Sequence, residues 1–165
     1  MMKQNKIAYA YKQLFLDKEY VVQGLSNFIQ EYIQTMNLQP ANPTLFQWLQ
    51  DHQFLQQASS HWTFSTNLEF VHVPQFRRPD IQQFHRVIHE SQIIFHRRWG
   101  DAPLRFVLAY LFWNNQQVMK LCHGYVHSMW DASDSTCSSK EQQVPVIRDA
   151  VLKQLQDCIP KSTCN

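Results

Sequence analysis

The amino-acid sequence predicts a single α/β domain over residues 1–165. Stretches with the apolar period of an amphipathic helix alternate along the chain with short runs of β-branched and aromatic residues, which is typical of α/β proteins. The length of 165 residues fits one domain. The composition, 44% hydrophobic and 17% charged, is that of a globular protein and not of a disordered chain.

Composition and charge also exclude several classes of function. The sequence has three glycines, Gly24, Gly100 and Gly124, so it contains no Gly-rich phosphate-binding loop. A formal charge of +2 is too small to indicate a nucleic-acid partner, which normally needs a concentrated basic stripe. The best apolar run, residues 106–113, is far shorter than the roughly 18 residues that cross a bilayer.

The first third of the chain predicts a strand followed by a helix. Residues 6–10 mix β-branched, aromatic and small side chains and predict a short strand. Apolar residues recur with helical spacing over residues 21–36, and Asp17 is a candidate N-cap before them. The polar segment around Asp17 is expected to separate the two elements, and the prolines within residues 37–43 end the helix.

A short helix and a second strand are expected next. Residues 43–51 predict a helix because Asn42 can cap it and Pro43 suits the first helical position. Residues 64–73 combine aromatic and β-branched side chains and predict one strand.

The second half of the chain predicts three further helices and one strand. A helix opens at Arg78, another covers about residues 102–113, and residues 145–157 form the last. Residues 117–121 predict a strand. The low-complexity segment 133–143 predicts a flexible loop.

Residues 95–103 form the densest cluster of aromatic and charged side chains, and two interpretations stay open from composition alone. In the first, Asp101 is the N-cap of the helix that follows and Pro103 lies in its first turn. In the second, the Asp101 carboxylate beside Trp99 and two arginines holds sugar hydroxyls or a diphosphate, with Trp99 as a wall of the site.

Two more side chains are candidates for chemistry. Glu69 either lies on the solvated face of a strand or, at the end of a strand, acts as a catalytic carboxylate. His127 is either a structural hydrogen-bonding group or a metal ligand, and its i, i+4 spacing from His123 would suit a metal only on a helix.

Four cysteines lie in the last part of the chain, and their spacing matches no zinc ribbon. They are compatible both with two disulfides in a secretory lumen and with free thiols; they are Cys122, Cys137, Cys158 and Cys164.

Several motifs together resemble the fungal Golgi α-1,2-mannosyltransferases of glycosyltransferase family 15. Residues 98–103, Arg-Trp-Gly-Asp-Ala-Pro, are identical to a block of that family. Residues 66–69 are similar to its Ser-Asn-Phe-Glu segment, 76–77 to its aromatic-Arg pair, and 124–127 to its Gly-Tyr-x-His segment. Residues 42–50 are similar to its Asn-x-x-x-x-Trp/Phe-Leu helix, so the resemblance covers about residues 6–137.

The resemblance implies a GT-A-like fold, represented here by its acceptor-side C-terminal portion. It also implies transfer of mannose from GDP-mannose to a mannosylated glycan or glycoprotein acceptor, with retention and with Mn²⁺, in the Golgi lumen. Glu69 would be the nucleophile or transition-state stabiliser, and His127 a metal ligand. The residues expected to bind substrate are Asp101, Trp99, Arg98 and Asn67.

The sequence also departs from the family pattern. The family's metal-binding Glu-Pro-Asp stretch and its type II membrane anchor lie upstream of the first strand, and the chain contains neither. We therefore expect an N-terminally incomplete domain whose first strand, near residues 7–11, has an unpaired edge. Arg97 stands where the family has a glutamate. The alternative function is that of a non-catalytic relative that binds glycan or a partner enzyme.

Overall fold

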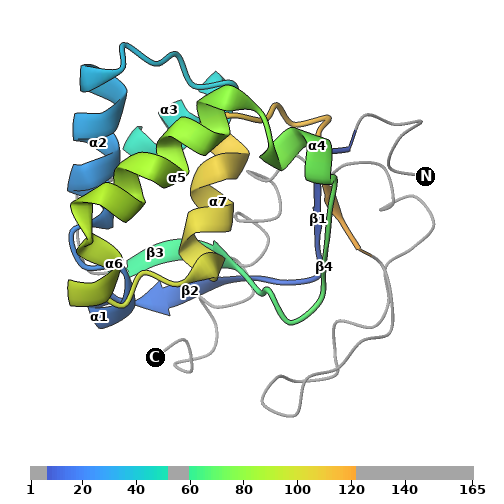
Figure 1. The fold of residues 1–165 in the computed structure, drawn as a ribbon. Helices are drawn as coiled ribbons and strands as arrows, with labels where there is room; N and C mark the ends of the chain where they lie inside the picture. The colour runs from blue at the N-terminus through green and yellow to red at the C-terminus, as the bar shows by residue number, and fades with distance from the viewer. Residues whose placement is uncertain (1–6, 52–59, 122–165) are drawn as a thin grey trace.

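The computed structural model describes residues 7–51 and 60–121, and it confirms the α/β class. Strands and groups of helices follow one another along the chain, and the long helices gather on one side of two small sheets (Figure 1). The elements in chain order are β1 Tyr9–Tyr11, β2 Leu14–Lys18, α1 Glu19–Val22, α2 Leu25–Thr35, α3 Pro43–Asp51, β3 Ser60–Phe64, β4 Glu69–Val71, α4 Val73–Phe76, α5 Pro79–Ser91, α6 Ile93–His96, α7 Asp101–Leu111 and β5 Val118–Lys120.

The first sheet has the strand order β4-β1-β5, with β1 in the centre (Figure 1). β1 runs antiparallel to β4, where Tyr11 lies opposite Glu69, and parallel to β5, where Tyr11 lies opposite Lys120. The predicted unpaired edge of the first strand is therefore wrong. The two strands that pair with β1 come from distant parts of the chain, and local sequence patterns do not contain that information.

The second sheet consists of β2 and β3, which pair antiparallel from Leu14 opposite Phe64 to Lys18 opposite Ser60. The polar segment around Asp17 was expected to be a break and Asp17 a helix cap, and both interpretations are wrong. Asp17 lies within β2, and its carboxylate accepts a hydrogen bond from the Lys18 backbone N–H at 2.9 Å. Pairing with β3 outweighs the weak strand propensity of these polar residues.

Two elements that the sequence predicts as continuous are each divided. The predicted helix over residues 21–36 breaks between α1 and α2 at Gly24, which has φ +80°. Glycine adopts this left-handed conformation without the steric cost that a Cβ atom brings. The predicted strand over residues 64–73 becomes β3 and β4, separated by residues 65–68, so that the chain passes from one sheet to the other.

The ends of the remaining helices follow local capping chemistry. The predicted helix over residues 43–51 is confirmed as α3, and the Asn42 side-chain oxygen accepts the Leu45 N–H at 3.2 Å. α7 begins at Asp101 with Gly100 as its N-cap, one residue earlier than predicted. Asp101 is therefore the first helical residue and not the cap, and its carboxylate accepts the Ala102 N–H at 3.0 Å.

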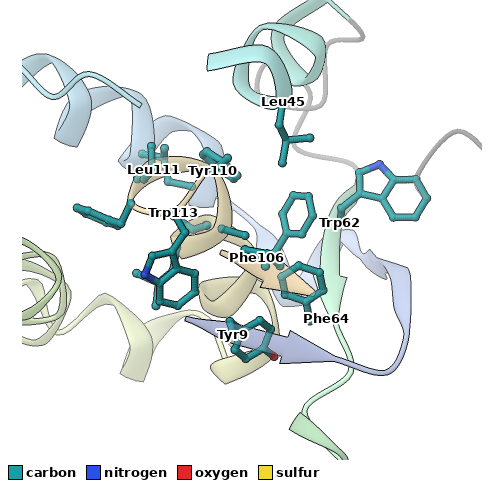
Figure 2. Packing of buried hydrophobic residues seen from close by; sticks show 14 of the residues in the cluster. Tyr9, Leu45, Trp62, Phe64, Phe106, Tyr110, Leu111 and Trp113 are labelled. Carbon is teal, nitrogen blue, oxygen red and sulfur yellow. The ribbon is translucent and has the colours of Figure 1, made fainter. Parts of the chain in front are cut away.

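The core is centred on α7, which packs against β3 and α3. Figure 2 shows Phe106 of α7 beside Phe64 of β3, and their ring centroids are 5.2 Å apart. On α5, Phe84 contacts Phe112 just after α7, with centroids 5.6 Å apart. Aromatic side chains from helices and strands therefore fill the space between the layers.

His61 of β3 is a titratable group inside this core. Its side chain is 2% exposed, and its Nδ1 lies 2.8 Å from the carbonyl oxygen of Trp62. Burial lowers the pKa of His61 from its ordinary 6.5 to about 4, because the charged imidazolium loses its hydration there.

The low pKa of His61 predicts acid destabilisation. Between pH 6.5 and 4 the unfolded chain takes up a proton that the folded state does not, so the free energy of unfolding falls as the pH falls, by up to about 3 kcal/mol. Urea unfolding at several pH values measures this. In His61→Gln, the decrease in the free energy of unfolding between pH 6.5 and 4 is expected to be smaller. His89 is exposed, so His89→Gln should show the same decrease as the wild type. Equal pH dependence in wild type and His61→Gln would contradict the assignment.

Candidate active site around Glu69

Glu69 is the first residue of β4, and its carboxylate is held from two sides. The Tyr9 hydroxyl donates a hydrogen bond to Glu69 Oε2 at 2.7 Å, and Arg105 Nε donates to the same oxygen at 3.4 Å. The side chain of Glu69 is 20% exposed. The carboxylate is thus oriented by the fold and still reaches the surface, so Glu69 is not a freely solvated side chain of an exposed strand face.

Tyr9 is a rigid donor because the core surrounds it. The residue is fully buried, and its ring stacks on Trp113 with centroids 5.9 Å apart and contacts Phe64 at 5.2 Å. Burial, and then the hydrogen bond to Glu69, raise the pKa of Tyr9 well above its ordinary value. The phenol therefore stays protonated at neutral pH and donates its hydrogen to Glu69.

Arg105 reaches Glu69 from α7. Its guanidinium carbon lies 4.9 Å from the centroid of the Phe76 ring at the end of α4, which adds a cation–π contact to the ion pair. Arg105 and Asp101 are four residues apart on α7, so they share one face of that helix. Through Arg105, α7 therefore places its first turn, where Asp101 lies, near the carboxylate of Glu69.

Asp101 is exposed at the start of α7, about one helical turn before Arg105, whose guanidinium contacts Glu69. Its negative charge is one of the influences that raise the pKa of the buried Tyr9. The structure thus brings Glu69 and Asp101, the two carboxylates that the sequence singles out, to the same region. In the chain, the 31 residues at positions 70–100 lie between them. Asn67 is exposed in the loop that leads into β4, two positions before Glu69.

The turn before α7 is anchored by Trp99. The indole is 4% exposed, donates its N–H to the Gln23 carbonyl at 3.0 Å and meets the Phe28 ring edge-on at 5.3 Å. These are the contacts of a core residue. A substrate contact by Trp99 stays a prediction; its observed role is to fix the turn that carries Arg98 and Asp101.

The two arginines beside Trp99 point to the surface. The Arg98 guanidinium lies 5.5 Å from the centroid of the exposed Tyr20 ring on α1. Arg97, which replaces a glutamate of the family pattern, donates to the side-chain oxygen of Gln23. Arg97 thus joins the turn before α7 to the segment between α1 and α2. This hydrogen bond accommodates the positive charge of Arg97.

Several predicted features lie outside the described residues. These are His127, the four cysteines, the loop 133–143 and the helix 145–157. Across residues 7–51 and 60–121, no group of three or more His, Cys, Asp and Glu side chains is arranged to hold a metal ion. In the same residues no helix has the length and apolar character needed to cross a membrane.

Tyr9 and Arg105 are the site residues that sequence reasoning missed. The i, i+4 spacing of Asp101 and Arg105 is a signal that could have identified Arg105. Nothing in the local sequence marks Tyr9, because its partner on β4 is brought to it only by strand pairing.

A separate depression of about 360 Å³ lies between the start of α3 and the loop after α7. The Asn42 amide donates to the Asn115 side-chain oxygen there and ties the two segments together. None of the predicted site residues lines this depression, so it does not belong to the Glu69 site; its lining is Ala41, Asn42, Pro43, Thr44, Asn114, Asn115 and Gln116.

Two curated proteins of a yeast are similar in sequence to this chain. The chain is 29% identical over 125 residues to O-glycoside alpha-1,2-mannosyltransferase homolog 3 of Schizosaccharomyces pombe, covering 74% of this chain and 33% of that relative. Homolog 2 of the same yeast is 26% identical over 102 residues, covering 61% of this chain and 26% of that relative. The chain thus spans about a third or less of the length of these relatives.

Two solved structures show the same fold. The Mn/GDP form of core-mannan synthase A from Aspergillus fumigatus superimposes with a TM-score of 0.69 at 21% identity, covering 88% of this chain and 40% of that one. The mannosyltransferase Ktr4p from S. cerevisiae, in complex with GDP, gives 0.65 at 22% identity, covering 77% of this chain and 34% of that one. The predicted GT-A-like α/β fold is therefore confirmed. The family model described as glycolipid 2-alpha-mannosyltransferase matches residues 1–151, and the chain accordingly belongs to that family, glycosyltransferase family 15.

Proposed function

We propose that this protein transfers mannose from GDP-mannose to a mannosylated glycan or glycoprotein acceptor, with retention at the anomeric carbon. The observation that carries the proposal is the Glu69 carboxylate, which Tyr9 and Arg105 orient while it still reaches the surface. The GDP complexes of two structural relatives support a nucleotide-sugar donor. A retaining transfer needs one carboxylate close to the anomeric carbon, and Glu69 is suited to this role.

The proposed roles follow from where each side chain lies. Glu69 stabilises the positive charge that develops on the sugar ring as the bond to the diphosphate breaks. Asp101, exposed at the start of α7, accepts a hydrogen bond from an acceptor hydroxyl and so positions it. Arg98 and Asn67 are both exposed and supply further hydrogen-bond donors to sugar hydroxyls or to the diphosphate.

Mn²⁺ and the Golgi lumen enter the proposal from the family and from the Mn/GDP form of one relative. The described residues alone do not form a metal site, so no step of the proposed reaction is routed through the ion. His127 is proposed as one ligand, because imidazole nitrogen is a suitable donor for Mn²⁺ beside carboxylate and phosphate oxygens.

A transfer assay tests the proposal. The full-length protein, given GDP-mannose, Mn²⁺ and an α-mannoside acceptor, is expected to form a product with one more mannose in α linkage. Asp101→Asn should raise the acceptor KM by about tenfold, because it weakens a hydrogen bond to a charged group, and should leave the KM for GDP-mannose unchanged.

Asp51→Asn is the matched control, because Asp51 lies exposed at the end of α3 and bonds only within that helix to Gln47 among the described residues. Glycan binding without any transfer would overturn the proposed reaction and establish the non-catalytic alternative. An equal change of both KM values in Asp101→Asn would contradict the role of Asp101 as an acceptor contact.

A further inference from the structure

The two donors that orient Glu69 converge on one of its two oxygens. Tyr9 Oη lies 2.7 Å and Arg105 Nε lies 3.4 Å from Oε2. Among the described residues no hydrogen bond reaches Oε1. Within the described part of the chain the carboxylate is therefore held asymmetrically, because both donors bind the same oxygen, Oε2.

Both donors are held in place by their own contacts. The binding of both to Oε2 is therefore a property of the folded structure and does not depend on mobile side chains. Tyr9 is fully buried on the central strand β1 and stacks on Trp113. The Arg105 side chain is 23% exposed and packs over Phe76. Rotation of the Glu69 carboxylate would break the hydrogen bond from Tyr9 and leave its hydroxyl buried without a partner, which is costly.

We infer that Tyr9 and Arg105 are positioning residues that hold Glu69 by Oε2 and so present Oε1 to the sugar. This rests on the proposed function, and it extends it by naming the reacting oxygen and the residues that select it. Preorganised groups stabilise a transition state because they need not reorient when charge develops. A carboxylate that rotates freely loses this advantage, although it keeps its charge.

A kinetic double-mutant cycle tests the inference. Tyr9→Phe is expected to lower kcat by about tenfold, as for loss of one hydrogen bond to a charged group, with little change in the KM for GDP-mannose. In a Glu69→Gln background the same substitution should cost no further activity, because residues that act as a unit are not additive. Arg105→Lys, which keeps the positive charge, should retain more activity than Arg105→Gln.

Tyr11→Phe is the matched control. Tyr11 lies on the same strand and is equally buried, and its hydroxyl has no hydrogen-bond partner among the described residues. Arg86→Gln, exposed on α5, is the control for Arg105. Both controls should retain wild-type kcat.

A second cycle, measured by urea unfolding, separates the inference from the proposed function. Tyr9→Phe and Glu69→Ala should couple by about tenfold in the unfolding equilibrium constant, because each of them removes the hydrogen bond between Tyr9 and Glu69. If wild type transfers mannose but Tyr9→Phe costs the same in both backgrounds, the positioning role is wrong and the proposed function stands. If wild type transfers none, the proposed function and the reacting-oxygen assignment fall. In that case, coupling between the two substitutions in the unfolding equilibrium supports the positioning of Glu69 by Tyr9. Absence of coupling overturns it.

Discussion

In the full-length protein, Glu69→Gln is expected to lower kcat for mannose transfer by a factor on the order of a hundred or more, while the KM for GDP-mannose stays within about twofold. The substitution keeps the size of the side chain and removes its charge. The positive charge on the sugar ring exists only near the transition state, so the loss falls on kcat and not on donor binding. The amide oxygen can still accept the hydrogen bond from Tyr9, which limits any structural disturbance.

Steady-state kinetics with GDP-mannose as the varied substrate measure this loss, and thermal unfolding confirms that the variant is folded. Glu31→Gln removes the charge of an exposed carboxylate on α2 and serves as the control. A folded Glu69→Gln protein with kcat within about threefold of wild type would be incompatible with a catalytic role for this carboxylate.

Phe106→Ala is expected to lower the free energy of unfolding by about 3–5 kcal/mol, the range for truncation of a fully buried phenylalanine. Phe106 is fully buried on α7, and its ring meets those of Phe64, His61 and Tyr110 at centroid distances of 5.2, 5.8 and 5.8 Å. Its removal leaves a cavity between α7 and β3, and the rigid aromatic neighbours have little freedom to fill it (Figure 2).

Urea unfolding followed by tryptophan fluorescence measures the change. Phe95→Ala is the matched control, because Phe95 is 71% exposed on α6 and its truncation should change stability by no more than about 0.5 kcal/mol. A cost below about 1 kcal/mol for Phe106→Ala would show that the core relaxes around the vacancy and that the packing on α7 is less rigid than described.

The long helices were predictable because their signals are local. The apolar period of α5 and α7, and the Asn42–Pro43 start of α3, depend on neighbours within a few residues. The break between α1 and α2 at Gly24 was missed, because one glycine inside an apolar period does not show whether the chain needs a left-handed residue there.

The strands were less predictable because strand pairing is not local. β2 carries Asp17 and Lys18, which have weak strand propensity, and it forms because β3 lies beside it. The central place of β1 likewise depends on β4 and β5, which follow much later in the chain. The expectation of an unpaired edge failed for this reason.

The sequence by itself determined which chemistry the site can carry. Glu69 and Asp101 are candidates for that chemistry from the segments 66–69 and 98–103, because motif identity depends on residue type and order alone. Only the tertiary structure decided how the Glu69 carboxylate is held. Tyr9 and Arg105 come from β1 and α7, and their contact with Glu69 exists only after the sheet has paired and α7 has packed on it, since hydrogen bonds between distant segments depend on three-dimensional position.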